Sequence, residues 1–113
     1  MDCIFCRIAA GEITSDIVHQ DDHVVAFRDL NPQAPVHILI VPRAHLVNLE
    51  AASAADGQVL GHCALVAAAI ARAEGLAEGG YRLVTNVGPD AGQSVDHLHF
   101  HLLGGRPMHW PPG

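Results

Sequence analysis

The chain has 113 residues, of which 50% are hydrophobic and 16% charged, and its formal net charge is −6. This length suits one domain and excludes a cofactor domain appended to a catalytic one, and the apolar fraction excludes an intrinsically disordered chain. The negative charge disfavours binding to DNA or RNA polymers, but it does not exclude a small nucleotide, because backbone N–H groups and imidazoles can hold a phosphate.

No membrane span or secretory signal is expected. Val59–Ala71 is nearly uncharged but shorter than the roughly 20 apolar residues that span a bilayer. Met1–Cys6 lacks the basic and apolar regions of a signal peptide. We therefore expect a cytoplasmic protein whose three cysteines stay reduced and form no disulfide framework.

The first half of the chain predicts a short helix followed by three strands. Gly11 ends an apolar N-terminal stretch, polar turn residues separate two β-branched runs, and Pro42 stops a third apolar run in which His37 is the only polar residue. The predicted elements are a helix over Cys3–Ala10, hairpin strands over Ile17–His19 and Val24–Arg28, and a buried strand over Val36–Val41.

The second half predicts one long helix and two strands. Ser53 and Asp56 have the spacing of a capping box, and apolar residues follow at helical spacing as far as Ile70. The helix is expected to end at Gly75 or at Gly79–Gly80, of which the double glycine is the stronger stop. The remaining predicted elements are strands over Tyr81–Val87 and Asp96–Leu103, the loop Gly88–Ser94 between them, and a tail over residues 104–113.

Together these elements predict an α+β fold. About five strands and one or two helices in 113 residues imply a sheet covered by a helix on one face. We expect a single domain over residues 1–113.

Residues 97–102 alternate between imidazole and apolar side chains, and a further leucine follows at 103. Side chains of a strand point alternately to opposite faces, so His97, His99 and His101 would share one face at a spacing of about 6.6 Å. An exposed strand face or an adventitious metal site would also carry histidines. Three histidines in register beside a glycine-rich loop that carries Ser94 favour a functional site, because one neutral imidazole can attack phosphorus while another donates to a phosphate oxygen.

The histidine pattern, the Gly92–Ser94 stretch before it and the tail Gly104–Gly113 after it resemble the histidine triad (HIT) nucleotide-binding family. The loop and the tail are similar to its Hint-like branch, and the resemblance runs from about Phe5 to Gly113. It implies a HIT-like fold with an antiparallel sheet, a homodimer, and a hydrolase that cleaves purine nucleoside 5′-phosphoramidates to nucleoside monophosphates. A covalent nucleotidyl-histidine would form without a catalytic metal.

The resemblance also implies roles for single residues. His99 would be the nucleophile, His101 and His37 would contact the phosphate, and Ser94 would hydrogen-bond near the leaving group. Trp110 would reach toward the partner's active site. Further nucleotide-binding positions would be Phe5 and Leu30 at the base, Asp29 at the ribose, and Asn86 and Gln93 near the phosphate. Read without the resemblance, Asn86 would end a strand, Asp29 would cap a turn, and Phe5 and Leu30 would belong to the core.

Cys3 and Cys6 form a C-x-x-C pair, which fits two buried thiols, a redox pair or half of a zinc site. A thioredoxin-like redox pair follows a strand, and no strand is predicted before Cys3. His45 and His97 would complete a Cys2His2 set, as bacterial-type members of the family imply. Four protein ligands make such a zinc structural rather than catalytic. Cys63 fits a core residue, and no role is assigned to His19, His23, His62 and His109.

Three other functions compete with the phosphoramidase hypothesis. A dinucleoside polyphosphate hydrolase of the related Fhit-like branch would share the triad but not the Hint-like tail. A nucleotide-binding regulatory module with little catalysis would not need all three triad histidines. A small zinc-binding structural protein would leave His37, His99 and His101 unexplained.

Overall fold

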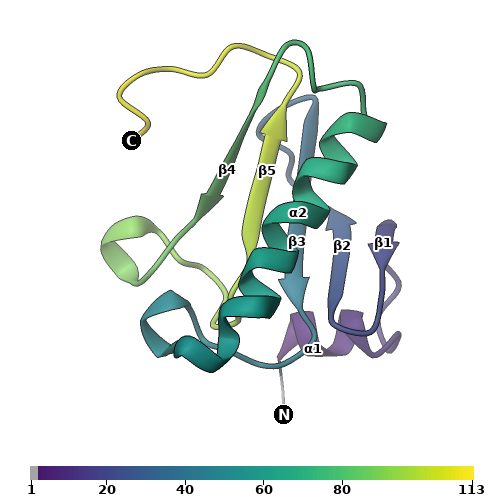
Figure 1. Cartoon of the computed structure of the whole chain (residues 1–113), viewed down its shortest axis with the longest axis vertical. Coiled ribbons are helices and arrows are strands. Elements are labelled where there is room, and N and C mark those ends of the chain that lie inside the picture. The colour runs from purple at the N-terminus through teal and green to yellow at the C-terminus, as the bar shows by residue number, and fades with distance from the viewer. Residues whose placement is uncertain (1–2) are drawn as a thin grey trace.

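A computed structural model describes residues 3–113, over which five strands form one antiparallel sheet in the order β1-β2-β3-β5-β4 (Figure 1). This confirms the predicted fold class. The strands are β1 (Ile17–Gln20), β2 (Val24–Arg28), β3 (Val36–Pro42), β4 (Tyr81–Thr85) and β5 (Phe100–Gly104).

Two α-helices pack on the sheet, the short α1 (Ile4–Ala9) and the long α2 (Gly57–Ala73). The sequence predicted a helix on one face only, whereas α1 and α2 cover opposite faces. The reason is visible in β3, where Ile38 and Ile40 belong to the core under α2, and Leu39 and Val41 to the core under α1. Successive strand residues point to opposite faces, so both faces of β3 are buried. Short 3-10 turns lie at Leu49–Ala51, Ala54–Asp56 and Pro89–Ala91.

The structure contains the predicted capping box before the long helix. In it, the Asp56 carboxylate accepts a hydrogen bond of 2.9 Å from the Ser53 backbone N–H. It encloses the 3-10 turn that leads into α2. The prediction that Gly79–Gly80 ends the helix was wrong, because the helix ends at Gly75. Its φ of +78° suits glycine, and the Leu76 N–H bonds back to the Ala71 carbonyl at 2.8 Å, as in a Schellman motif.

The segment Ala54–Ala73 is long and apolar enough, at a mean hydropathy of 1.4, to cross a membrane by length and composition alone. The nearly uncharged part of it, Val59–Ala71, is shorter than the roughly 20 residues of a bilayer span. In the structure Cys63, Val66 and Ile70 of this segment pack on the sheet. We therefore interpret its composition as that of a helix with an apolar stripe toward the core.

The last strand starts later than predicted, at Phe100 rather than Asp96, and ends at Gly104. The backbone before it leaves the ladder, since the Leu98 N–H donates to the Leu46 carbonyl at 2.6 Å instead of to β3. His97 and His99 consequently precede β5, and His101 lies within it. β4 likewise ends at Thr85 rather than Val87.

Candidate active site

Four histidines gather on the face of the sheet that α1 covers. His37 comes from β3, His101 from β5, and His97 and His99 from the irregular segment before β5. The ring of His101 lies 5.0 Å from that of His99 and 5.2 Å from that of His37, measured between centroids. The rings of His99 and His101 therefore meet as the alternation predicted, although His99 lies outside the strand.

The backbone of His97 fixes the tautomer of His99. His99 Nδ1 lies 2.7 Å from the His97 carbonyl oxygen. A carbonyl oxygen only accepts, so Nδ1 carries the proton and Nε2 keeps its lone pair. The Thr85 hydroxyl donates to the His99 carbonyl at 2.9 Å, which holds the backbone of the same residue. His99 is buried, and the lone pair on its Nε2 can act as a nucleophile or a base.

A chain of hydrogen bonds fixes the tautomers of His37 and His101 in the same way. The Gln33 backbone N–H donates to His37 Nδ1 at 3.0 Å, so the ring proton of neutral His37 is on Nε2. This Nε2–H donates to His101 Nδ1 at 2.9 Å, which leaves the proton of His101 on Nε2. Asp29 Oδ2 lies 3.4 Å from His37 Nε2 and further favours the Nε2 tautomer. His99 thus offers a lone pair beside His101, which offers an N–H donor.

Burial keeps the hydrogen-bonded imidazoles of His37 and His101 neutral. It lowers the pKa of His37, and it lowers the pKa of His101 to about 4, with His99 and His37 adding to the effect. Both rings are therefore neutral at pH 7, which the chain of donors and acceptors requires. A neutral His101 donates to an anion from one defined atom.

A cavity of about 270 Å³ opens beside His99 and His101. Ser94, Asp29 and Phe5 also line it, and Phe5 packs edge-on against His99 at a centroid distance of 5.1 Å. Leu30 lies at the rim and is 97% exposed, so the interpretation of Leu30 as a core residue was wrong. Asp29 both lines the cavity and caps a turn, because its Oδ1 accepts from the Asn31 N–H at 2.8 Å.

Two of the predicted nucleotide-binding residues, Asn86 and Gln93, are not among the residues that line this cavity. The Gln93 amide is engaged by its own loop and by the segment after β3: Oε1 accepts from the Gly88 N–H, and Nε2 donates to the Val47 carbonyl at 2.7 Å. The Gln93 side chain therefore shapes the loop that carries Ser94.

Several lining residues were missed by the sequence analysis. Period-two alternation in the strands could have identified some of them, because Phe27 and Leu39 must share the face of His37 and His101. Thr85, which holds the His99 backbone, was also missed, because no sequence pattern marks it. The missed apolar residues of the wall are Ile4, Ile8, Ile13, Phe27, Leu39 and Val95.

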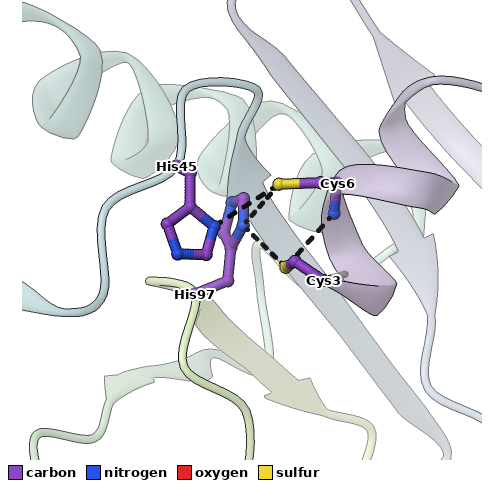
Figure 2. Close-up of side chains that lie close together, drawn as sticks. All are labelled: Cys3, Cys6, His45 and His97. Atoms are coloured by element: carbon purple, nitrogen blue, oxygen red, sulfur yellow. Dashed lines mark hydrogen bonds between the residues drawn. The ribbon is translucent and has the colours of Figure 1, made fainter. Parts of the chain in front are cut away.

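The two cysteines and two histidines of the predicted metal set also come together (Figure 2). Cys3 Sγ lies 3.4 Å from His97 Nδ1, and Cys6 Sγ lies 3.4 Å from His45 Nδ1 and 3.5 Å from His97 Nδ1. A tetrahedral zinc with ligand bonds of about 2.3 Å to sulfur and 2.0–2.1 Å to nitrogen separates neighbouring S and N atoms by about 3.6 Å. The observed separations fit that geometry.

The chemistry of the donor set fits as well. His97 Nε2 lies 2.8 Å from the Pro42 carbonyl oxygen, so it carries the ring proton and Nδ1 is free to bind a metal. Burial lowers the pKa of His97 and keeps the ring neutral. Cys63, in contrast, is buried against the sheet, where burial raises its pKa to about 12. This supports its assignment to the core.

The C-terminal tail starts close to the histidines and then leaves the sheet. Arg106 Nε and Nη2 donate to the Gln33 carbonyl at 3.1 and 3.0 Å. Further along, Arg82 Nη2 donates to the His109 carbonyl at 2.9 Å. Trp110 is 84% exposed and does not line the cavity of its own chain.

Comparisons with known proteins agree with this arrangement. A model of the HIT domain matches residues 10–108. The chain is 54% identical to the purine nucleoside phosphoramidase of Escherichia coli (strain K12) over 105 residues, which are 93% of this chain and 88% of that protein. It is 52% identical to the 14 kDa zinc-binding protein of Zea mays over 112 residues, at 97% and 87% coverage. The crystal structure of a HIT family hydrolase from Legionella pneumophila Philadelphia 1 superimposes with a TM-score of 0.97 at 49% identity, covering 99% of this chain and all of that one (100%).

Proposed function

Because the chain belongs to the HIT domain family, we propose that it hydrolyses purine nucleoside 5′-phosphoramidates through a covalent nucleotidyl intermediate on His99. The observation that carries this proposal is the pair of opposite tautomers at the cavity. His99 Nε2 has a lone pair because Nδ1 bonds to the His97 carbonyl, and His101 Nε2 has a proton because Nδ1 accepts from His37.

The reaction uses these two atoms at the phosphorus. His99 Nε2 attacks it, the P–Nε2 bond forms and the P–N bond to the amine breaks, while the His101 Nε2–H stabilises charge on a non-bridging oxygen. The carbonyl of His97 stabilises the imidazolium that His99 becomes. Water then cleaves the P–Nε2 bond and releases the nucleoside monophosphate. The amine departs in the first step with a proton taken from solvent beside the Ser94 hydroxyl, and the water that attacks in the second step leaves its oxygen on phosphorus and returns a proton to solvent, so that one water is consumed overall.

The rest of the cavity suits a nucleoside. Phe5 and Phe27, edge-on at 5.5 Å, belong to an apolar wall that can pack against a purine. The Asp29 carboxylate can accept hydrogen bonds from ribose hydroxyls, and the Ser94 hydroxyl can bond near the departing amine. Asn86 and Gln93 would act at the phosphate side through the loop that they flank.

A structural zinc on Cys3, Cys6, His45 and His97 forms the second part of the proposal. The tetrahedral fit of the four donor atoms supports it, and so does the similarity to a protein named for zinc binding. The metal would hold the ring of His97, whose carbonyl orients His99. We expect about one zinc per chain and a lower melting temperature in Cys6→Ser, whereas zinc-free protein with unchanged stability in that variant would exclude the site.

A homodimer forms the third part. β4 is an edge strand, and Tyr81 on it and Leu65 on α2 are 42% and 70% exposed. Sedimentation should therefore give twice the chain mass. Trp110 would then lie beside the partner's leaving-group pocket, so deletion of Met108–Gly113 should change selectivity between amines more than stability. Equal losses for all leaving groups would contradict this role.

The decisive test compares hydrolysis of an adenosine 5′-phosphoramidate carrying a fluorescent amine with hydrolysis of diadenosine tetraphosphate. We expect the wild type and the control His23→Ala, whose ring lines a different cavity, to cleave the phosphoramidate, and His99→Ala to lose this activity. Preference for the dinucleotide would place the protein in the Fhit-like branch. Nucleotide binding without cleavage of either substrate would indicate a regulatory module.

A further inference from the structure

Two of the histidines to which the sequence assigned no role have their rings against one aspartate outside the active site. His19 is on β1, Asp21 is in the turn after it, and His62 is on α2. Asp21 Oδ2 lies 2.8 Å from His19 Nε2 and 2.7 Å from His62 Nε2. The three ligand atoms lie within 4.8 Å of one another, so residues 41 positions apart in the chain converge on one point.

The carboxylate is held in place by its other oxygen. Asp21 Oδ1 accepts from the backbone N–H groups of His23 at 2.8 Å and Val24 at 2.9 Å. Arg43 Nε donates to the Asp21 carbonyl at 2.7 Å, which fixes the backbone. Burial opposes ionisation of this carboxyl, but hydrogen bonds from His19, His23 and His62 outweigh it and lower the pKa. Oδ2 is therefore an ionised, preoriented acceptor.

We propose that His19, Asp21 and His62 bind a divalent transition-metal ion that prefers nitrogen and oxygen ligands, with Cu²⁺ bound more tightly than Ni²⁺ or Zn²⁺. With ligand bonds of about 2.0–2.1 Å, the N–O separations of 2.7 and 2.8 Å give an angle of about 85° at the metal. Such angles suit neighbouring positions of tetragonal or octahedral centres, which Cu²⁺ and Ni²⁺ prefer. The site shares no residue with the cysteine-containing set.

The site also has room for a further ligand. His62 and His23 both line a cavity of about 380 Å³, together with Gln58 of α2. Water or the His23 imidazole can complete the coordination sphere from this side. The metal would link the β1–β2 turn to α2, where the single hydrogen bond between His62 and Asp21 now does so.

The test uses untagged protein already loaded with one equivalent of zinc, titrated with Cu²⁺ and followed by electron paramagnetic resonance. We expect one additional equivalent with nitrogen hyperfine splitting from two imidazoles, and paramagnetic broadening of NMR signals of residues 19–24 and 58–62. His62→Gln should weaken Cu²⁺ binding at least tenfold, and the matched control His109→Gln, in the exposed tail, should not.

Two outcomes would overturn the proposal. One is the absence of a second equivalent of bound metal. The other is unchanged Cu²⁺ affinity in His62→Gln, which would mean adventitious binding elsewhere, such as at Asp29, His37 and His101. His19→Gln, on a different element, repeats the test if His62→Gln lowers the melting temperature of the metal-free protein.

Discussion

The two faces of the sheet are both covered by a helix, but they differ in what lies between helix and sheet. Under α2 the packing is apolar, with Ile38, Ile40 and Leu102 completely buried. Under α1, apolar residues share the face with His37 and His101, and a cavity remains. The same two central strands, β3 and β5, therefore supply a core on one side and a site on the other.

Helix length explains the difference. α2 has 17 residues and spans the sheet, whereas α1 has 6 and covers only one end of it (Figure 1). A rise of 1.5 Å per residue makes the short helix about 9 Å long. The part of the face that α1 leaves open becomes the pocket. Substitutions in the two layers should consequently affect different properties.

The largest effect is expected at His101, on the α1 face. His101→Ala removes the Nε2–H donor and the acceptor of His37, and we expect kcat/KM for phosphoramidate cleavage to fall by about a thousandfold, or about 4 kcal/mol. The melting temperature should change little. His101→Asn keeps an N–H donor and should recover part of the rate. Wild-type rates in both variants would exclude a role for this imidazole.

The next effect is on stability, at a neighbouring pair of residues in β3. Ile38→Ala opens a cavity under α2 and should lower the free energy of unfolding by about 3 kcal/mol in urea denaturation. Activity per folded molecule should stay the same. The Leu39 side chain lines the cavity beside His101. Leu39→Ala should therefore raise KM for the nucleotide in addition to lowering stability. A change in KM in the Ile38 variant would contradict the separation of the two faces.

The pH dependence of stability should also separate the faces. The pKa of His101, about 4, is below the ordinary 6.5, so the unfolded chain binds more protons between these values. Stability is therefore complete above pH 6.5 and falls as the pH is lowered to about 4, by on the order of 2 kcal/mol. Asp21, whose pKa is lowered from 3.8, contributes stability that is lost only below pH 4. Urea titrations should show that His101→Ala flattens the first slope, to which the lowered pKa values of His37 and His97 also contribute, and leaves the second slope unchanged.

The smallest effect is expected at an ion pair between the sheet and α2. Arg28 Nη1 lies 2.8 Å from Glu74 Oε1 and joins the end of β2 to the C-terminus of α2. The side chains are partly exposed, so Glu74→Gln should cost only about 0.5 kcal/mol. The loss should be seen in low salt and disappear in high salt. An effect that persists in high salt would mean that the pair does more than attract electrostatically.

Much of the fold could be predicted from local sequence signals. Apolar and β-branched runs bounded by turn residues located the strands, and the capping residues Ser53 and Asp56 located the start of the helical region. The end of α2 was misplaced because a single Gly75 at positive φ is enough to end a helix when Leu76 can bond back to Ala71. The start of β5 was misplaced because a tertiary bond from Leu98 to Leu46 replaces the ladder.

The candidate site could be predicted in part, for a related reason. Alternation alone placed His99 beside His101, but the tautomers depend on a carbonyl of His97 and an N–H of Gln33 that no pattern reveals. The cluster around Asp21 was invisible to the sequence, because His62 reaches it only when α2 packs beside the β1–β2 turn. Contacts between distant segments are what the sequence analysis lacked.

Gln33 is held from both sides, since its carbonyl accepts from Arg106 and its N–H donates to His37. The first residues of the tail are thus three hydrogen bonds away from the proton on His101. In the proposed reaction, a shift of the tail would move the His101 proton relative to the phosphate without a change in the shape of the pocket. A second chain that binds the tail would thereby alter the rate of the proposed reaction without entering the pocket.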